Sequence, residues 1–147
     1  MAGNALVATY DPKKVIVTYG GIPIGGYADG TFISIEPNAE TWTKKVGADG
    51  EVVRAMSNDN THTVTITLQQ SSESNKYLSN CKNTDKLTGL GMQSLAVTDL
   101  NGETLFFWQQ AWISTDPSFE YAKEATDRQW VLHTGQISQQ AESGLNF

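Results

Sequence analysis

The chain has 147 residues, of which 39% are apolar and 18% are charged, and its net charge is −6 at pH 7. This length suffices for one domain, residues 1–147, whose core needs neither disulfides nor metal. The charge pattern contains no basic stripe, which argues against tight nucleic-acid binding. A mildly acidic surface would repel DNA, and simple solubility is the alternative explanation of the acidity.

Because Cys81 is the single cysteine, no internal disulfide can form. This is consistent with assembly in a reducing host cytoplasm. Apolar runs stay well short of the roughly 18 residues of a membrane helix. Residues 1–10 lack the charged and apolar regions of a secretion signal. We therefore expect no membrane binding by this chain.

The first part of the chain has the pattern of short strands separated by glycine pairs. Lys13–Tyr19 alternates as a strand does, and Gly20-Gly21 predicts a turn. Pro23 places the short piece that follows at a sheet edge, because proline cannot donate to a ladder. A second strand is expected over Thr31–Pro37.

Residues 40–57 have the least core-like pattern. Two arms, Trp42–Val46 and Glu51–Met56, flank a Gly/Asp tip and carry charges on both sides. The pattern predicts a long hairpin-like excursion that does not pack on its own core. Loops of this kind are usually functional or disordered.

Residues 61–68 read T-H-T-V-T-I-T-L, with threonine at every second position. Side chains of a strand alternate between two faces. The pattern therefore predicts a strand with one apolar face, made of His62, Val64, Ile66 and Leu68, and one uncharged hydroxyl face.

One helix, about three turns long, is expected after this strand. Ser71 or Ser72 can cap its N-terminus, and Glu73 suits the positive end of the helix dipole. Tyr77 and Leu78 belong to a narrow apolar stripe on one side.

Three further strands are expected over residues 92–99, 104–114 and 127–138. Asn101-Gly102 predicts a hairpin turn before the second of them. That strand is apolar on both faces, with Trp108 and Trp112 expected on the same face. It therefore requires a second layer from another sheet, the helix or a neighbouring subunit.

The sequence contains no recognisable catalytic or metal-binding motif. His62 and His133 are the only histidines, and neither lies in an HxxxH or CxxC arrangement. Cys81 has no basic neighbour, and scattered carboxylates do not suggest a hydrolytic pair. We expect no enzyme, no cofactor and no metal.

The four tryptophans allow a second interpretation. Trp42, Trp108, Trp112 and Trp130 would form a sugar-stacking platform in a carbohydrate-binding or adhesion β-sandwich. Core packing and subunit contact are the favoured alternative, since tryptophan is enriched at interfaces.

Three passages together resemble the tail tube proteins of contractile-tailed bacteriophages, which share a fold with the hemolysin-coregulated tube proteins of type VI secretion. They are DPKKV to GIPIGGY (residues 11–27), WTKKVGADGEVVR (42–54) and TVTITLQQS (63–71). The resemblance implies a mainly β fold with one α-helix (α+β). It would be an antiparallel β-sandwich or rolled sheet that joins a multi-subunit β-barrel.

By this resemblance the protein is a structural component of the virion tail. Copies would self-assemble into hexameric rings, and stacked rings would form the hollow tube that conducts DNA during ejection without specific binding. Sheath, baseplate and tail-terminator proteins are the implied partners. A non-contractile tail or a related injection device would give nearly the same sequence.

The resemblance also assigns roles to residues. The inter-ring contact residues are Trp42, Lys44, Lys45, Val46, Asp49, Glu51 and Arg54. The lumen-facing residues are Thr61, Thr63, Thr65 and Thr67. A lumen suits short uncharged side chains because lysines would hold phosphates, whereas exposure to outside solvent is the alternative. Leu145 and Phe147 near the end of the sequence are expected to contact neighbouring subunits.

Overall fold

The computed structural model describes residues 10–101 and 104–141. Its elements in chain order are the 3-10 helix η1 (Pro12–Lys14), the strands β1 (Val15–Tyr19), β2 (Ile22–Ile24), β3 (Ile33–Pro37), β4 (Trp42–Val46), β5 (Val52–Met56) and β6 (His62–Gln69), the helix α1 (Ser74–Thr88), and the strands β7 (Gln93–Asp99), β8 (Thr104–Thr115), β9 (Asp127–Thr134) and β10 (Ile137–Ala141).

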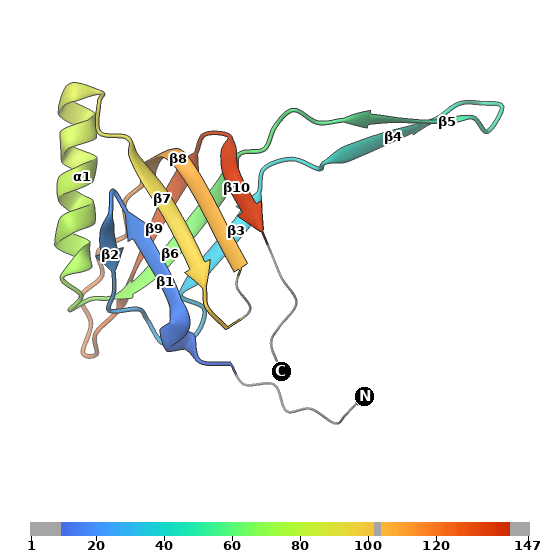
Figure 1. The fold of residues 1–147 in the computed structure, drawn as a ribbon. Coiled ribbons are helices and arrows are strands. Elements are labelled where there is room, and N and C mark those ends of the chain that lie inside the picture. Colours follow the sequence, from blue (N-terminus) through green and yellow to red (C-terminus); the bar gives the residue numbers. More distant parts are fainter. Residues whose placement is uncertain (1–9, 102–103, 142–147) are drawn as a thin grey trace.

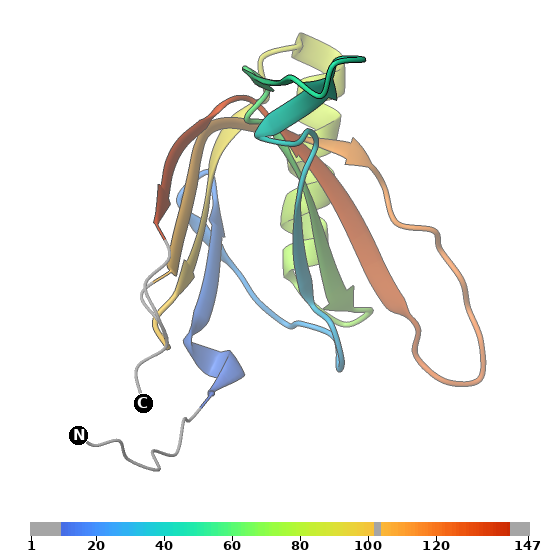
Figure 2. The same cartoon turned by 90° about the vertical axis from the view of Figure 1, so that its right-hand side faces the viewer.

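Eight strands form one antiparallel sheet in the order β2-β1-β7-β8-β9-β6-β3, with β10 also paired to β8. The sheet is rolled, so that β1 and β7 face β3 and β6 across its interior (Figure 2). Strands β4 and β5 form a separate two-stranded sheet that projects from the body (Figure 1). The expected mainly β fold with one helix is confirmed for the described residues, in the form of a single rolled sheet.

The core fills the interior of this roll. In β6 the even-numbered side chains from His62 to Leu68 are buried and the threonines between them are not, as the alternation predicts. The fully buried side chains with the largest volumes are Trp108, Tyr19, Ile66, Leu68, Leu78, Leu95, Leu132, Val17 and Val64. Because they come from α1 and five strands (β1, β6, β7, β8 and β9), the core fixes the register of these strands in the roll.

Helix α1 packs on the interior face of the sheet. Leu78 is fully buried, and the Tyr77 hydroxyl donates to the Tyr19 carbonyl oxygen at 2.7 Å. The helix has 15 residues, about four turns rather than the expected three. It ends at Gly89, which adopts the left-handed conformation that suits a helix C-terminus.

The capping prediction for α1 was wrong. Glu73 occupies the N-cap position and makes no side-chain cap bond. Ser72 lies one residue earlier, where its Oγ accepts from the Ser74 N–H at 3.2 Å and donates to the Gly25 carbonyl at 2.6 Å. Ser72 therefore satisfies the first helical N–H from one residue before the N-cap position, and it also joins the helix start to the loop after β2.

A β-bulge in β8 contradicts the predicted faces of its tryptophans. The pairing with β7 shifts between Leu95–Trp108 and Gln93–Ala111, so β8 has one extra residue in this stretch. Trp108 consequently points into the core with Ala111, whereas Trp112 lies on the opposite face. The two tryptophans do not share a face, because strict alternation fails at the bulge.

Two strand boundaries also differ from the prediction. Lys13 and Lys14 belong to η1, because Asp11 Oδ1 accepts the Lys13 N–H at 3.0 Å and Pro12 starts a helical turn. The strand expected over residues 127–138 divides at a turn, where the Gly135 N–H donates to the Gln110 carbonyl at 2.8 Å. β10 then pairs with β8 rather than with β6. Pro23 lies in the edge strand β2, as predicted.

Candidate assembly surfaces

The β4–β5 hairpin is the most exposed element of the described chain. Its strands pair in antiparallel register from Trp42↔Met56 to Val46↔Val52, and every residue of both strands is exposed. It extends from the body on the side away from α1 (Figure 1). The predicted excursion is therefore present as an ordered ribbon that makes no core contact.

One face of the hairpin combines apolar and basic side chains. The directly opposed pairs Trp42↔Met56, Lys44↔Arg54 and Val46↔Val52 share this face, because alternate residues of a strand point the same way. The Arg54 guanidinium lies 4.0 Å from the centre of the Trp42 ring. A two-stranded ribbon with exposed apolar side chains gains little stability in water, so this face is suited to a partner.

The hairpin tip is compact and acidic. The Gly47 N–H donates to the Glu51 carbonyl at 2.7 Å, and Asp49 Oδ1 accepts the Glu51 N–H at 3.2 Å. Asp49 and Glu51 thus lie together at the end of the ribbon, while Lys45 points to the opposite face from Lys44.

A second surface is the outward sheet face, formed by side chains that point away from the core. On β3, β6, β9 and the end of β8 it comprises Ser34, Glu36, Thr63, Thr65, Thr67, Asp127, Gln129, Val131, His133 and Trp112. On β1, β7 and the start of β8 it continues through Ile16, Thr18, Ala96, Thr98, Leu105 and Phe107. None of these residues is Lys or Arg.

Three of the four predicted threonines lie on this face. Thr63, Thr65 and Thr67 are half-buried in β6. Thr61 precedes the strand, and its Oγ1 donates to Asp59 Oδ1 at 2.6 Å and accepts from Asn38 Nδ2 at 2.9 Å. Thr61 therefore belongs to a polar network at the root of the hairpin. The part of the face on β1 and β7 was missed, although the alternation of Ile16 with Val17 could have revealed it.

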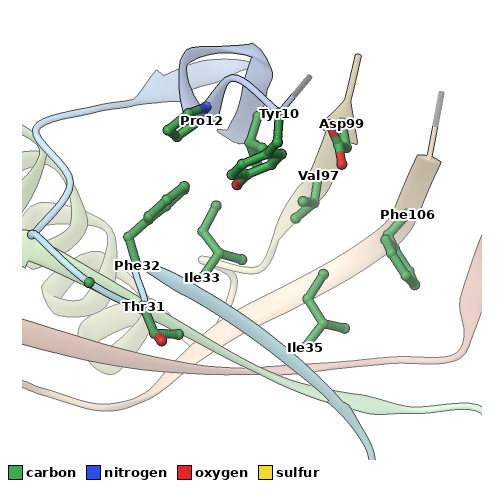
Figure 3. A pocket seen from close by; sticks show the side chains of 11 residues that line it. Tyr10, Pro12, Thr31, Phe32, Ile33, Ile35, Val97, Asp99 and Phe106 are labelled. Carbon is green, nitrogen blue, oxygen red and sulfur yellow. The ribbon is translucent and has the colours of Figure 1, made fainter. Parts of the chain in front are cut away.

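One cavity lies at the open side of the roll, between β3 and the ends of β1, β7 and β8 (Figure 3). Its volume is about 550 Å³, and Phe32, Ile33, Ile35 and Phe106 are among its lining residues. Asp99 is its one carboxylate.

The perturbed tyrosines have structural roles. Burial raises the pKa of Tyr19, whose hydroxyl donates to the Ala111 carbonyl at 3.1 Å. Burial also raises the pKa of Tyr77 to about 12. Both hydroxyls remain protonated donors to backbone carbonyls. Within residues 10–101 and 104–141, no group of three or more His, Cys, Asp or Glu side chains could hold a metal ion.

The tryptophans do not form a common platform. Trp108 and Trp130 are buried, Trp112 is half-buried, and Trp42 lies on the hairpin. Leu145 and Phe147 lie outside the described residues. Among the described helices, none is long and apolar enough to cross a membrane.

Solved structures with the same fold come from contractile injection systems. The tube-terminating cap of an anti-feeding prophage gives a TM-score of 0.62 at 14% identity, covering 95% of this chain and 97% of that one. A sheath-tube complex of an extracellular contractile injection system gives 0.60 at 14% identity, covering 90% and 93%. The sheath/tube terminator of such a system gives 0.61 at 13% identity, covering 90% and 97%. These likenesses establish the fold.

Sequence comparison identifies relatives in phages. "Structural protein ORF10" of Pseudomonas phage KPP10 is 28% identical over 140 residues, which is 90% of this chain and 80% of that protein. The profile of a family described as "Bacteriophage PhiTE tail tube protein" matches residues 15–141. Because this match covers most of the chain and its β-sheet, the protein belongs to the bacteriophage PhiTE tail tube protein family and is a phage structural protein.

Proposed function

We propose that copies of this chain close into hexameric rings and that stacked rings form a hollow tail tube through which DNA leaves the virion. The observation that carries the proposal is the β4–β5 hairpin, an ordered ribbon whose apolar side chains are all exposed. Such an element is stable and useful only when another chain covers it. The hairpin residues from Trp42 to Arg54 then form the contact between rings.

Ring closure would use the edges of the rolled sheet. The outer edge of β3 and the outer edge of β10 have no strand partner among the described residues. A head-to-tail contact between these two different edges of successive subunits closes a ring and leaves neither of them free. Leu145 and Phe147 would add further contacts between subunits.

The outward sheet face would line the lumen. Its only charged side chains are the acids Glu36 and Asp127, and its centre consists of Thr63, Thr65 and Thr67. A wall without lysine or arginine would not hold DNA phosphates, so DNA could pass without specific binding. The opposite arrangement, with this face toward outside solvent, is the outcome that the lysine variants below would reveal.

The remaining surface would meet the other tail proteins. Sheath, baseplate and tail-terminator proteins are the proposed partners, and the sheath-tube complex with the same fold supports the first of them. Assembly would take place in the host cytoplasm, before the tail joins the virion.

The experiment is negative-stain electron microscopy of the purified protein with and without the hairpin. Replacing Lys44–Arg54 by two glycines should leave folded subunits or single rings but no stacked tubes. The matched control is Leu87→Ser, which removes an even more exposed apolar side chain from α1 and should leave the tubes intact. Normal tubes without the hairpin, or a monomer retained on a glycan column, would contradict the proposal.

A further inference from the structure

The loop between β8 and β9 presents aromatic side chains beside the start of α1. Pro117, Phe119 and Tyr121 line a pocket of about 340 Å³, which Lys76 of α1 and Arg128 of β9 also line. We name it the Arg128 pocket. Phe119 is 64% exposed and Tyr121 is 80% exposed. Two neighbouring aromatic rings with this exposure mark a surface that another molecule covers.

Arg128 is buried without a counter-ion. Its side chain is 4% exposed, and its guanidinium lies 5.2 Å from the centre of the Phe119 ring and 5.6 Å from that of Tyr121. Nη1 donates to Thr126 Oγ1 at 2.7 Å. Among the described residues, the one ion pair within 4.0 Å is Lys82 with Asp116, so no described carboxylate reaches Arg128. A buried cation of this kind gains most from a carboxylate supplied by a partner.

The pocket is basic on an acidic protein. Lys76 and Arg128 line it, and no Asp or Glu does, although the chain as a whole carries a net charge of −6. The hairpin tip has the complementary character. Its two acidic residues are Asp49 and Glu51, and the exposed Val46 and Val52 lie directly beside them. The charges of the tip and the pocket are opposite in sign, and the two valines would contact the aromatic rings of the pocket.

The tip of a subunit's own hairpin does not reach its own pocket. The hairpin root adjoins the start of β6, whereas Gln70, which follows the end of β6, lines the pocket. Eight residues of β-strand separate these two ends by about 26 Å. The hairpin also projects to the side opposite α1 (Figure 1). A contact between tip and pocket therefore joins two copies head to tail, and such contacts propagate along a stack.

We propose that the Arg128 pocket receives the hairpin tip of a second copy of the chain, with Asp49 and Glu51 pairing with Arg128 and Lys76. This inference rests on the proposed assembly through the hairpin and names the surface that accepts it. Other surfaces for the tip, such as the recess that Asp116, Glu120 and Asp127 line beside the same loop, are outcomes of the test.

Charge exchange tests the pairing without altering the buried arginine. Glu51→Lys should lower the assembled fraction about tenfold in sedimentation assays at physiological salt, and Lys76→Glu should do the same. The double variant should recover to within about threefold of the original protein. The matched control, Lys86→Glu on the far part of α1, should neither weaken assembly nor rescue Glu51→Lys.

Cross-linking tests the contact directly. In a Cys81→Ser background, Glu51→Cys with Lys76→Cys should give a ladder of covalent oligomers with a short bis-maleimide, and Glu51→Cys with Lys86→Cys should not. Tubes that form normally while only the second pair cross-links, or neither does, would overturn the pairing and leave the proposed function standing. Failure of the unaltered protein to assemble at any concentration would overturn both.

Discussion

The indole Nε1 of Trp108 donates a hydrogen bond to Nδ1 of His62 at 3.3 Å, inside the core below the root of the hairpin. The two rings meet edge to face, and Phe106 stacks on Trp108 and also meets His62 edge to face. Because Nδ1 accepts a proton donor, His62 is neutral and carries its hydrogen on Nε2. The first strand residue after the hairpin is thus held by a bond that requires an uncharged imidazole.

This bond makes the stability of the fold depend on pH. Burial lowers the pKa of His62, and the nearby Asp59 opposes that shift. Below about pH 6.5 the unfolded chain therefore binds more protons at His62 than the folded chain does. The free energy of unfolding should fall as the pH drops through that value, and it should level off below the folded-state pKa of His62. Thermal unfolding between about pH 8 and pH 5 measures the effect. His62→Gln should flatten the curve, and His133→Gln, at an exposed site, should leave it unchanged.

The loop after β2 provides a prediction on stability. Gly26 has φ +74°, and a Cβ at this position would lie 2.5 Å from Ser72 Oγ and 3.3 Å from Ser72 Cα. Gly26→Ala should therefore destabilise the fold through backbone strain and steric overlap together, by about 2 kcal/mol or more. Gly21→Ala is the matched control, because Gly21 has φ +80° and open space around it. Equal losses in urea unfolding would show that the contact with Ser72 is unimportant.

The contact of α1 with the sheet provides another prediction on stability. Leu78→Ala should cost about 2–5 kcal/mol, because the side chain is fully buried and its removal leaves a cavity. The exposed Leu87 of the same helix serves as the control, since Leu87→Ala should change stability by less than about 0.5 kcal/mol. Chemical denaturation of both variants gives the comparison, and similar losses would mean that α1 does not pack as described.

The hairpin face should matter for assembly but not for folding. Trp42→Ser combined with Met56→Ser removes two exposed side chains that face each other across the ribbon. The melting temperature of the unassembled subunit should change by no more than about 2 °C, because neither residue belongs to the core. The assembled fraction should drop, as turbidity and sedimentation would show. Loss of the folded subunit would assign the hairpin a role in the core instead.

The outward sheet face can be tested by adding charge. Thr63→Lys with Thr65→Lys should leave tubes intact and impair DNA delivery, because ammonium groups in a lumen hold phosphates. Microscopy of tubes and plating efficiency of phage with the altered subunit are the two measurements. Unchanged delivery with intact tubes would mean that this face does not line the lumen. Asn83→Lys, at an exposed position of α1, is a control for added charge elsewhere.

The sequence predicted those features whose cause is local. The predicted alternation of β6 is confirmed, because burial of Val64, Ile66 and Leu68 on one side requires it. The hairpin prediction was correct because two short arms flank a Gly/Asp turn, in which Gly50 adopts φ +87°. Both features depend on neighbours in the chain.

The features that sequence did not reveal depend on distant partners. The bulge in β8 follows from the fit of Trp108 and Ala111 against β7, which no local pattern encodes. Arg128 alternates onto the same face of β9 as the buried Trp130, yet its isolation from any described carboxylate emerges only when α1 and the loop after β8 meet around it. Tertiary packing, rather than residue type, creates that pocket.

Pro23 in the three-residue edge strand β2 makes this border of the sheet chemically different from the borders at β3 and β10. Proline offers no N–H, so a further chain cannot extend the ladder along this border. In contrast, β3 has its proline, Pro37, only at its last residue, and β10 contains none. Uncontrolled growth into fibrils needs templates at both borders of a sheet. With one border blocked, a protein made in many copies can polymerise in an ordered direction and still avoid amyloid-like stacking.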